Sequence, residues 1–266
     1  MGWTVEAKNL WFSYIRGEYV IRGVCLRAEP GNVTAIIGPT GCGKSTLIFI
    51  LAGLLKPEKG LVLYNGLPLE NIVSKVRREI GVLFQNPDDQ LFNPTVYDEI
   101  AYSLRTLGVV EEKIKSRVED VAERLRISHL LNRSPFRLSV GEKKKVALAS
   151  ILAYEPNVLF LDEPTSNLSG TDVEIVSKTI WEAKSKGKTV IVASHDLEFI
   201  LQNSDYVYVV NNGQVKMECR SDDLVKENVI ENVGLKKPLL FEVIKELNIS
   251  YEKVLNILRE LRKKFR

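Results

Sequence analysis

The sequence contains few of the residues that stabilise secreted proteins or structural metal sites. Its 266 residues include three cysteines, Cys25, Cys42 and Cys219, which are odd in number and far apart, and only two histidines. This spacing predicts neither a disulfide framework nor a zinc site.

Long apolar runs are also missing. No stretch approaches the roughly 20 apolar residues that a membrane-spanning helix needs, and residues 1–6 lack the charged and then apolar pattern of a secretory signal. We therefore expect the chain to stay in the cytosol. The net charge of +3 is too small to indicate a nucleic-acid partner by itself.

Strand and helix patterns alternate along most of the chain. Hydrophobic residues make up 45% of it, enough for one large α/β domain with an appendage. Alternating apolar positions over residues 4–30 predict an antiparallel β subdomain. Farther along, apolar strands separated by helices predict a mostly parallel sheet with helices on its faces. Its expected strands are residues 33–37, 80–84, 158–161, 189–193 and 206–210, and its expected helices are residues 44–55, 172–186 and 196–203.

Two regions depart from this alternation. A charge-rich helical pattern begins at residue 95 and predicts a helical subdomain over about residues 95–150. After residue 220, apolar positions recur at helical spacing and predict a C-terminal helical extension. We therefore expect a main domain over residues 1–220 and an extension over residues 221–266.

The most specific motif is a phosphate-binding loop of the form G-x-x-x-x-G-K-S. It reads Gly38-Pro39-Thr40-Gly41-Cys42-Gly43-Lys44-Ser45, with Thr46 next. An expected strand precedes it and an expected helix follows, which is the context that distinguishes this loop from an ordinary glycine turn. Its glycines let backbone N–H groups converge on a phosphate, beside the positive end of the helix. Lys44 is expected at the β- and γ-phosphates and Ser45 on Mg²⁺.

Two acids end the apolar strand at residues 158–161. Asp162 is placed to orient Mg²⁺ through water, and Glu163 is placed to polarise an attacking water as a general base. By themselves, two acids at a strand end are equally consistent with plain solvent exposure. The phosphate loop favours the catalytic interpretation.

Further segments follow in a fixed order. Gln85 and His195 each follow an apolar strand, and two short motifs lie between them: Leu138-Ser139-Val140-Gly141-Glu142 and Ser166-Asn167-Leu168-Ser169. Together with the phosphate loop and the two acids, these motifs resemble the ATP-binding subunits of ABC transporters over about residues 4–220. The resemblance implies the fold of a P-loop ABC ATPase, with ATP and Mg²⁺ as cofactors.

The resemblance assigns residue roles. Glu163, His195 and Lys44 would be catalytic, Gln85 would join Ser45 and Asp162 at Mg²⁺, and Tyr14 would stack on adenine. A surface glutamine and a core tyrosine are the alternatives at Gln85 and Tyr14. The other histidine, His129, is read as structural.

The segment over residues 138–142 resembles the family signature L-S-G-G-Q, which binds the γ-phosphate held by the opposite subunit. Ser139, Val140, Gly141 and Glu142 would form this half-site, although Val140 replaces a glycine and Glu142 a glutamine. Ser139 and Glu142 also form the pattern of a helix capping box, and the two interpretations are compatible. In the motif over residues 166–169, Ser169 replaces an aspartate that usually helps to arrange the subunit interface.

The stretch Gln85-Asn86-Pro87-Asp88-Asp89-Gln90 resembles the energy-coupling factor class, which imports vitamins and transition-metal ions. In that class the segment forms a short acidic helix beside a groove for a membrane scaffold protein. Gln85, Asp88, Asp89 and Gln90 would contact this partner, and the acids have the sign that its basic helices need. A plain Asn-Pro-Asp-Asp turn is the alternative.

The implied partners are a transmembrane scaffold subunit, a substrate-binding membrane subunit and a second ATP-binding subunit, at the cytoplasmic face of the membrane and without nucleic acid. Since the altered positions serve the partner's site, we expect a heterodimer. The C-terminal extension would contact either the second ATPase or the chain's own body. Two alternatives remain: a soluble ABC-type ATPase acting on nucleic acid or ribosomes, and a catalytically silent regulatory cassette.

Overall fold

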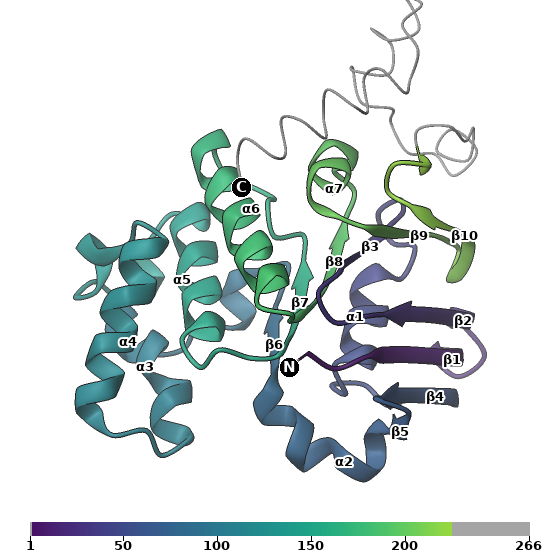
Figure 1. Cartoon of the computed structure of the whole chain (residues 1–266), viewed down its shortest axis with the longest axis horizontal. Coiled ribbons are helices and arrows are strands. Elements are labelled where there is room, and N and C mark those ends of the chain that lie inside the picture. Colours follow the sequence, from purple (N-terminus) through teal and green to yellow (C-terminus); the bar gives the residue numbers. More distant parts are fainter. Residues whose placement is uncertain (1, 225–266) are drawn as a thin grey trace, which may run out of the picture.

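Two β-sheets set the layout of the computed structural model, which describes residues 2–224 (Figure 1). The larger sheet has the order β10-β9-β3-β8-β7-β6, in which all neighbours run parallel except β10 and β9. Its strands are β3 (Val33–Ile37), β6 (Ile80–Leu83), β7 (Val158–Asp162), β8 (Thr189–Ser194), β9 (Tyr206–Asn211) and β10 (Gln214–Arg220). The predicted mostly parallel core is confirmed.

The smaller sheet is antiparallel, with the order β2-β1-β4-β5. Its strands are β1 (Val5–Ser13), β2 (Tyr19–Ala28), β4 (Lys59–Tyr64) and β5 (Leu67–Pro68). Helix α1 (Lys44–Leu51) lies between the two sheets, because Leu47 and Ile48 share one apolar cluster with Val24 of β2 and Phe160 of β7. The helix that follows the phosphate loop is therefore covered on both sides and held firmly in place.

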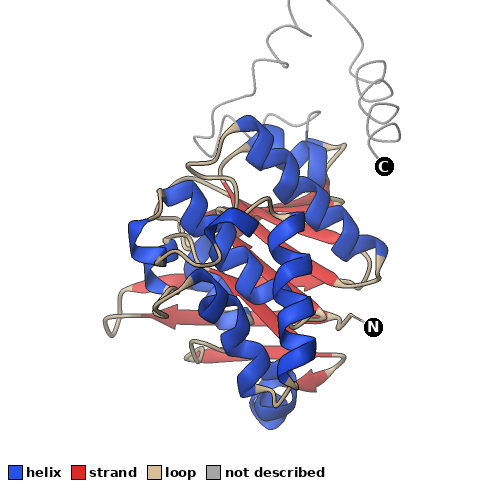
Figure 2. Cartoon of the chain, turned by 90° about the vertical axis from the view of Figure 1, so that its left-hand side faces the viewer, coloured by secondary structure: helices blue, strands red, loops and turns tan. Residues whose placement is uncertain are grey.

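Helices cover the opposite face of the larger sheet. Alternate residues of β3, such as Ala35 and Ile37, face these helices, whereas Ile36 faces α1. Helices α5 (Val140–Leu152), α6 (Gly170–Ser185) and α7 (Leu197–Asn203) lie against its strands, and α3 (Val96–Thr106) and α4 (Glu111–Arg124) pack against α5. Helices α3, α4 and α5 gather at one side of the molecule, and Figure 2 shows the helical face in front of the strands.

Several element boundaries differ from the sequence prediction. Helix α1 ends at Leu51 rather than near residue 55, because Gly53 takes a left-handed φ of 73°. Gly108, with a φ of 76°, divides the helical stretch after residue 95 into α3 and α4. Helix α2 (Leu69–Val76) was not predicted, although its apolar residues have helical spacing. The C-terminal extension falls on residues 225–266, outside the described residues, and the domain limits remain a prediction.

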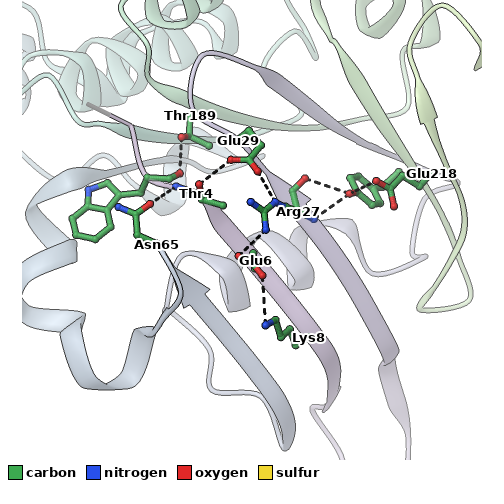
Figure 3. Close-up of polar contacts among 10 residues, drawn as sticks. Thr4, Glu6, Lys8, Arg27, Glu29, Asn65, Thr189 and Glu218 are labelled. Carbon is green, nitrogen blue, oxygen red and sulfur yellow. Dashed lines mark hydrogen bonds and ion pairs between the residues drawn. The ribbon is translucent and has the colours of Figure 1, made fainter.

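A polar network joins the two sheets next to the apolar cluster (Figure 3). In the smaller sheet, the Arg27 guanidinium contacts Glu6 and Glu29, and its backbone N–H donates to the Tyr208 hydroxyl of β9 over 3.1 Å. Tyr208 in turn donates to Glu218 of β10 over 2.8 Å. The sheets are thus fixed to each other by directional bonds as well as by apolar packing.

Candidate functional site

The phosphate loop links β3 to α1, as its spacing predicts. Gly41 and Gly43 have φ values of 80° and 107°, in the left-handed region that favours glycine. At Gly38 a Cβ atom would lie 2.1 Å from the Val210 carbonyl oxygen, so a side chain has no room there. Gly43 is the N-cap of α1 and provides no side-chain cap, which leaves the N–H groups of the helix available to a phosphate.

Lys44 is folded back onto the loop. Its buried ammonium donates to the carbonyl oxygens of Gly38 over 2.8 Å and Pro39 over 3.1 Å. Cys42, also in the loop, is buried, and burial raises the pKa of its thiol, so the group stays protonated and unreactive. Among residues 2–224, the Lys44 ammonium bonds only to these neutral carbonyl oxygens, which phosphate oxygens can replace.

Asp162, the last residue of β7, is the most unusual group of the site. Its side chain is completely buried, and neither carboxylate oxygen has a hydrogen-bond partner among the described residues. Burial is the main cause that raises its pKa, while the nearby Ser45 hydroxyl and Lys44 oppose that rise. A buried carboxylate without a partner is costly, and it fits a cation that is bound directly or through water.

Ser45 and Gln85 line the same cavity as Asp162. This cavity has a volume of about 440 Å³ and also borders Val140 and Asn167. The structure thus brings together the three residues predicted to face Mg²⁺. No group of three or more His, Cys, Asp or Glu residues within residues 2–224 forms a complete metal site by itself. That suits Mg²⁺, which commonly binds one or two protein oxygens together with substrate phosphates and water.

Glu163 and His195 are in direct contact. The Glu163 carboxylate is buried, lies 2.8 Å from His195 Nδ1 through Oε1, and accepts a bond from the Ser194 hydroxyl over 3.2 Å through Oε2. His195 follows β8, and its side chain is 59% exposed, so the pair reaches from the sheet edge to solvent. This arrangement holds a carboxylate at the surface of the site in a fixed orientation.

The signature segment caps helix α5, and the predicted capping box is present. The Ser139 hydroxyl and backbone N–H both donate to Glu142 Oε2 over 2.8 Å, and Glu142 N–H donates back to the hydroxyl over 3.3 Å. These bonds to Ser139 are the main cause that lowers the pKa of Glu142, so its carboxylate is charged at neutral pH. Val140, at the first position of the helix, is exposed.

The acidic segment after β6 forms a short 3₁₀ helix, Pro87–Asp89, capped by Asn86. Asp88 is exposed but already lies 2.7 Å from Lys143 Nζ of α5. The Gln90 amide bonds to the backbone of Val82 and Phe84 and thereby fixes the turn, and its contact with a membrane partner stays a prediction.

Tyr14 lies at the edge of the phosphate loop. Its side chain is exposed, its hydroxyl lies 3.2 Å from Thr46 Oγ1, and its ring packs edge-on against Phe12. An exposed ring fixed next to the loop is suited to stacking on a base.

Sequence reasoning missed two buried charged residues beside the site. Lys144 of α5 is 1% exposed and bonds to the backbone carbonyl of Glu163. Glu99 of α3 is buried and accepts bonds from the N–H groups of Phe92 and Asn93. In the sequence, Lys144 lies in a run of three lysines and Glu99 in an amphipathic helix, so neither pattern signals burial.

Comparison with known sequences gives these motifs a context. The family model described as ABC transporter matches residues 21–166, more than half of the chain. The energy-coupling factor transporter ATP-binding protein EcfA of Methanothermobacter thermautotrophicus is 36% identical over 250 residues, which cover 92% of this chain and 80% of the relative. A putative ABC transporter ATP-binding protein of Archaeoglobus fulgidus is 41% identical, covering 87% of this chain and 97% of the relative.

Solved structures agree in fold. CbiO1 from Clostridium perfringens, described as part of the ABC transporter complex CbiONQ, matches with a TM-score of 0.76 at 33% identity and covers 92% of this chain and 100% of its own. A dimeric post-hydrolysis state of the cassette MJ0796, bound to ADP and phosphate, matches with a TM-score of 0.73 at 27% identity and covers 82% and 98%.

The chain therefore belongs to the ABC transporter family of ATP-binding proteins. The predicted resemblance to the energy-coupling factor class is confirmed by its relatives, and the chain is an ATPase whose hydrolysis is coupled to transport. None of the helices described within residues 2–224 is both long and apolar enough to cross a membrane.

Substitution of Asp162 tests whether this carboxylate is a stabilising or a functional group. Because burial raises its pKa, the charged carboxylate opposes folding. The protonated carboxyl contributes stability in acid, and this contribution is lost as pH rises through the folded-state pKa. Asp162→Asn should therefore raise the melting temperature at neutral pH, by about 2–4 °C for each kcal/mol gained, while ATP hydrolysis falls. Calorimetry and an ATPase assay measure the two effects.

Asp120→Asn, at an exposed position on α4, is the matched control and should change neither quantity appreciably. A lower melting temperature in Asp162→Asn would show that the carboxylate has a stabilising partner instead.

Proposed function

We propose that the chain binds and hydrolyses Mg-ATP in an energy-coupling factor importer of vitamins or transition-metal ions. The observation that carries this proposal is the contact between the Glu163 carboxylate and His195 at the same sheet edge as the partnerless Asp162. A fixed carboxylate beside a cation site is what water attack on a terminal phosphate requires.

The residues divide the work of hydrolysis among them. The loop at residues 38–45 holds the phosphates, and Lys44 exchanges its two loop carbonyls for phosphate oxygens. Ser45, Gln85 and Asp162 would hold Mg²⁺, which, when bound, neutralises phosphate charge. Glu163 accepts the proton of the attacking water, and His195 orients that carboxylate.

A second cassette would complete the site. The head of α5 is exposed at Ser139 and Val140, which would meet a nucleotide held by the partner, and a dimeric cassette among the solved relatives supports such an assembly. ATP binding would close the pair because the γ-phosphate is contacted from both sides only in the closed form.

The two sites of the pair would differ in strength. Ser139 uses its hydroxyl proton on Glu142, whose negative charge would face the partner's triphosphate. Val140 adds bulk where the family has glycine. These features favour a partner of different sequence, one that supplies a regular signature to the site built from Lys44, Asp162 and Glu163.

A groove beside the acidic turn suits a membrane partner. This cavity has a volume of about 260 Å³, and its lining combines the aromatic rings of Phe84, Phe92 and Tyr102 with the buried carboxylate of Glu99. Gln90, which directly follows Asp88 and Asp89 on the turn, also lines it. Apolar walls with acids nearby suit a helix with apolar residues and basic ends, as expected of a transmembrane scaffold, and this contact would place the chain at the cytoplasmic face of the membrane.

Purification of the chain from detergent-solubilised membranes tests this assignment. We expect mass spectrometry to identify a membrane scaffold, a substrate-binding membrane protein and a second cassette. Predominant recovery with ribosomes or nucleic acid would support the soluble alternative and contradict the proposal.

Glu163→Gln tests the general base. The amide preserves the shape of the side chain but does not accept the proton of water, so turnover should fall by about 100-fold or more, while ATP binding remains and a closed pair accumulates. Single-turnover kinetics and gel filtration with ATP measure these effects. Lys44→Ala, which should lose binding as well, is the control, and normal turnover in Glu163→Gln would exclude Glu163 as the base.

Glu142→Gln tests whether the charge of Glu142 weakens the binding of the partner's nucleotide at residues 138–142. Removal of the charge should tighten the ATP-dependent association of the cassettes by about 3–10-fold, about 1 kcal/mol. Sedimentation analysis in the Glu163→Gln background measures this, and Glu112→Gln, an exposed acid in the first turn of α4, is the matched control. Weaker association in Glu142→Gln would show that the carboxylate supports the interface.

A further inference from the structure

Helix α5 carries three consecutive lysines with three different partners. Lys143 pairs with Asp88 after β6, and Lys145 lies 2.9 Å from Asp172 of α6. Lys144, between them, turns inward and is 1% exposed. Lysine is almost never buried this completely without a specific partner, so its environment requires an explanation.

The Lys144 ammonium is bound to the turn that follows β7. It donates to the backbone carbonyl of Glu163 over 2.8 Å and to the Ser166 hydroxyl. The same carbonyl also accepts bonds from the Ser166 N–H over 3.2 Å and from its hydroxyl over 3.0 Å. The Glu163 carbonyl is therefore the point at which α5 and this turn are joined.

The turn is strained at the residue that Lys144 holds. Glu163 has a φ of 47°, and Asn167 has a φ of 61°. Asparagine tolerates this conformation, but for Glu163 it costs about 1–3 kcal/mol and persists only where surrounding contacts impose it. Burial lowers the pKa of Lys144 to about 8, against the opposing effect of Glu163 and Asp162. A strained turn and a buried charge thus coincide, as they often do at functional sites.

We propose that Lys144 is a positioning residue for ATP hydrolysis, which fixes the Glu163 turn to helix α5. The inference rests on the proposed role of Glu163 as the base. Because the side chain of Glu163 extends from this turn to His195, its orientation depends on where α5 lies. The N-terminus of α5 would contact the partner's nucleotide. A displacement of α5 caused by that contact would be transmitted to Glu163 of the same chain through the Lys144 side chain.

Lys144→Met, in the full-length chain within its purified complex, tests the proposal. We expect kcat for ATP hydrolysis to fall by about 10–100-fold, with KM for ATP changed by less than about twofold, because Lys144 contacts the base turn and not the phosphate loop. Lys145→Met removes the neighbouring ion pair and should leave kcat within about twofold. Normal kcat in Lys144→Met, or an equal fall in Lys145→Met, would overturn the proposal.

Ser166→Ala and amide hydrogen exchange provide two further readouts, and Ser166→Ala keeps the test decisive if Lys144→Met folds poorly. Ser166→Ala removes only the hydroxyl that Lys144 contacts and should lower kcat in the same direction, by a smaller factor; an unchanged kcat would count against the anchor. Amide hydrogen exchange at Ser166 and Leu168, whose N–H groups bond within the turn, should accelerate in Lys144→Met and not in Lys145→Met.

The exchange readout does not depend on the role of Glu163. Normal turnover in Glu163→Gln together with faster exchange in Lys144→Met would remove the proposed base, and with it the positioning role, but keep the anchor. Unchanged exchange in Lys144→Met would remove the anchor itself.

Discussion

The parallel pairing of β3, β8 and β7 is the constraint on which the site depends. Ile37 of β3 lies opposite Ser194 of β8, and Ala193 of β8 lies opposite Asp162 of β7. These strands therefore end at the same level, and residues far apart in the sequence meet at one edge. A register shift of a single residue in β7 would turn each of Asp162 and Glu163 to the face of the sheet opposite its present one. The geometry of the candidate site therefore depends on backbone pairing.

Four charged side chains are buried at this edge of the larger sheet, and within the described structure all but one of them have hydrogen-bond partners. Lys44 has loop carbonyls, Glu163 has Ser194 and His195, and Lys144 has the Glu163 carbonyl. Asp162 lacks such a partner. An unpaired buried carboxylate opposes folding, which agrees with the proposed role of Asp162 at Mg²⁺ and not with a stabilising one.

The sequence was sufficient for features encoded locally. The phosphate loop, the β7 acids and the capping box of Ser139 each depend on residues within a short segment, and the parallel order of the strands follows from their alternation with helices. The sequence was not sufficient to predict where a long side chain of one element bonds to the backbone of another. Lys144 looks like a surface residue in the sequence, and only the packing of α5 reveals that it faces inward, just as only the fold reveals that the Gln90 amide bonds to the backbone of Val82. Boundaries shifted where a glycine took a left-handed conformation, as at Gly53 and Gly108.

Helix α5 contacts three neighbouring elements, each through a different lysine. Adjacent residues on a helix point about 100° apart, so the three lysines reach the acidic turn, the Glu163 turn and α6 without competing. The acidic turn and the turn that begins at Glu163 are thus both attached to helix α5. In the proposed dimer, an altered signature at the N-terminus of α5 would change how strongly the partner's nucleotide displaces this helix. The contacts of α5 with the acidic turn and with the Glu163 turn would remain.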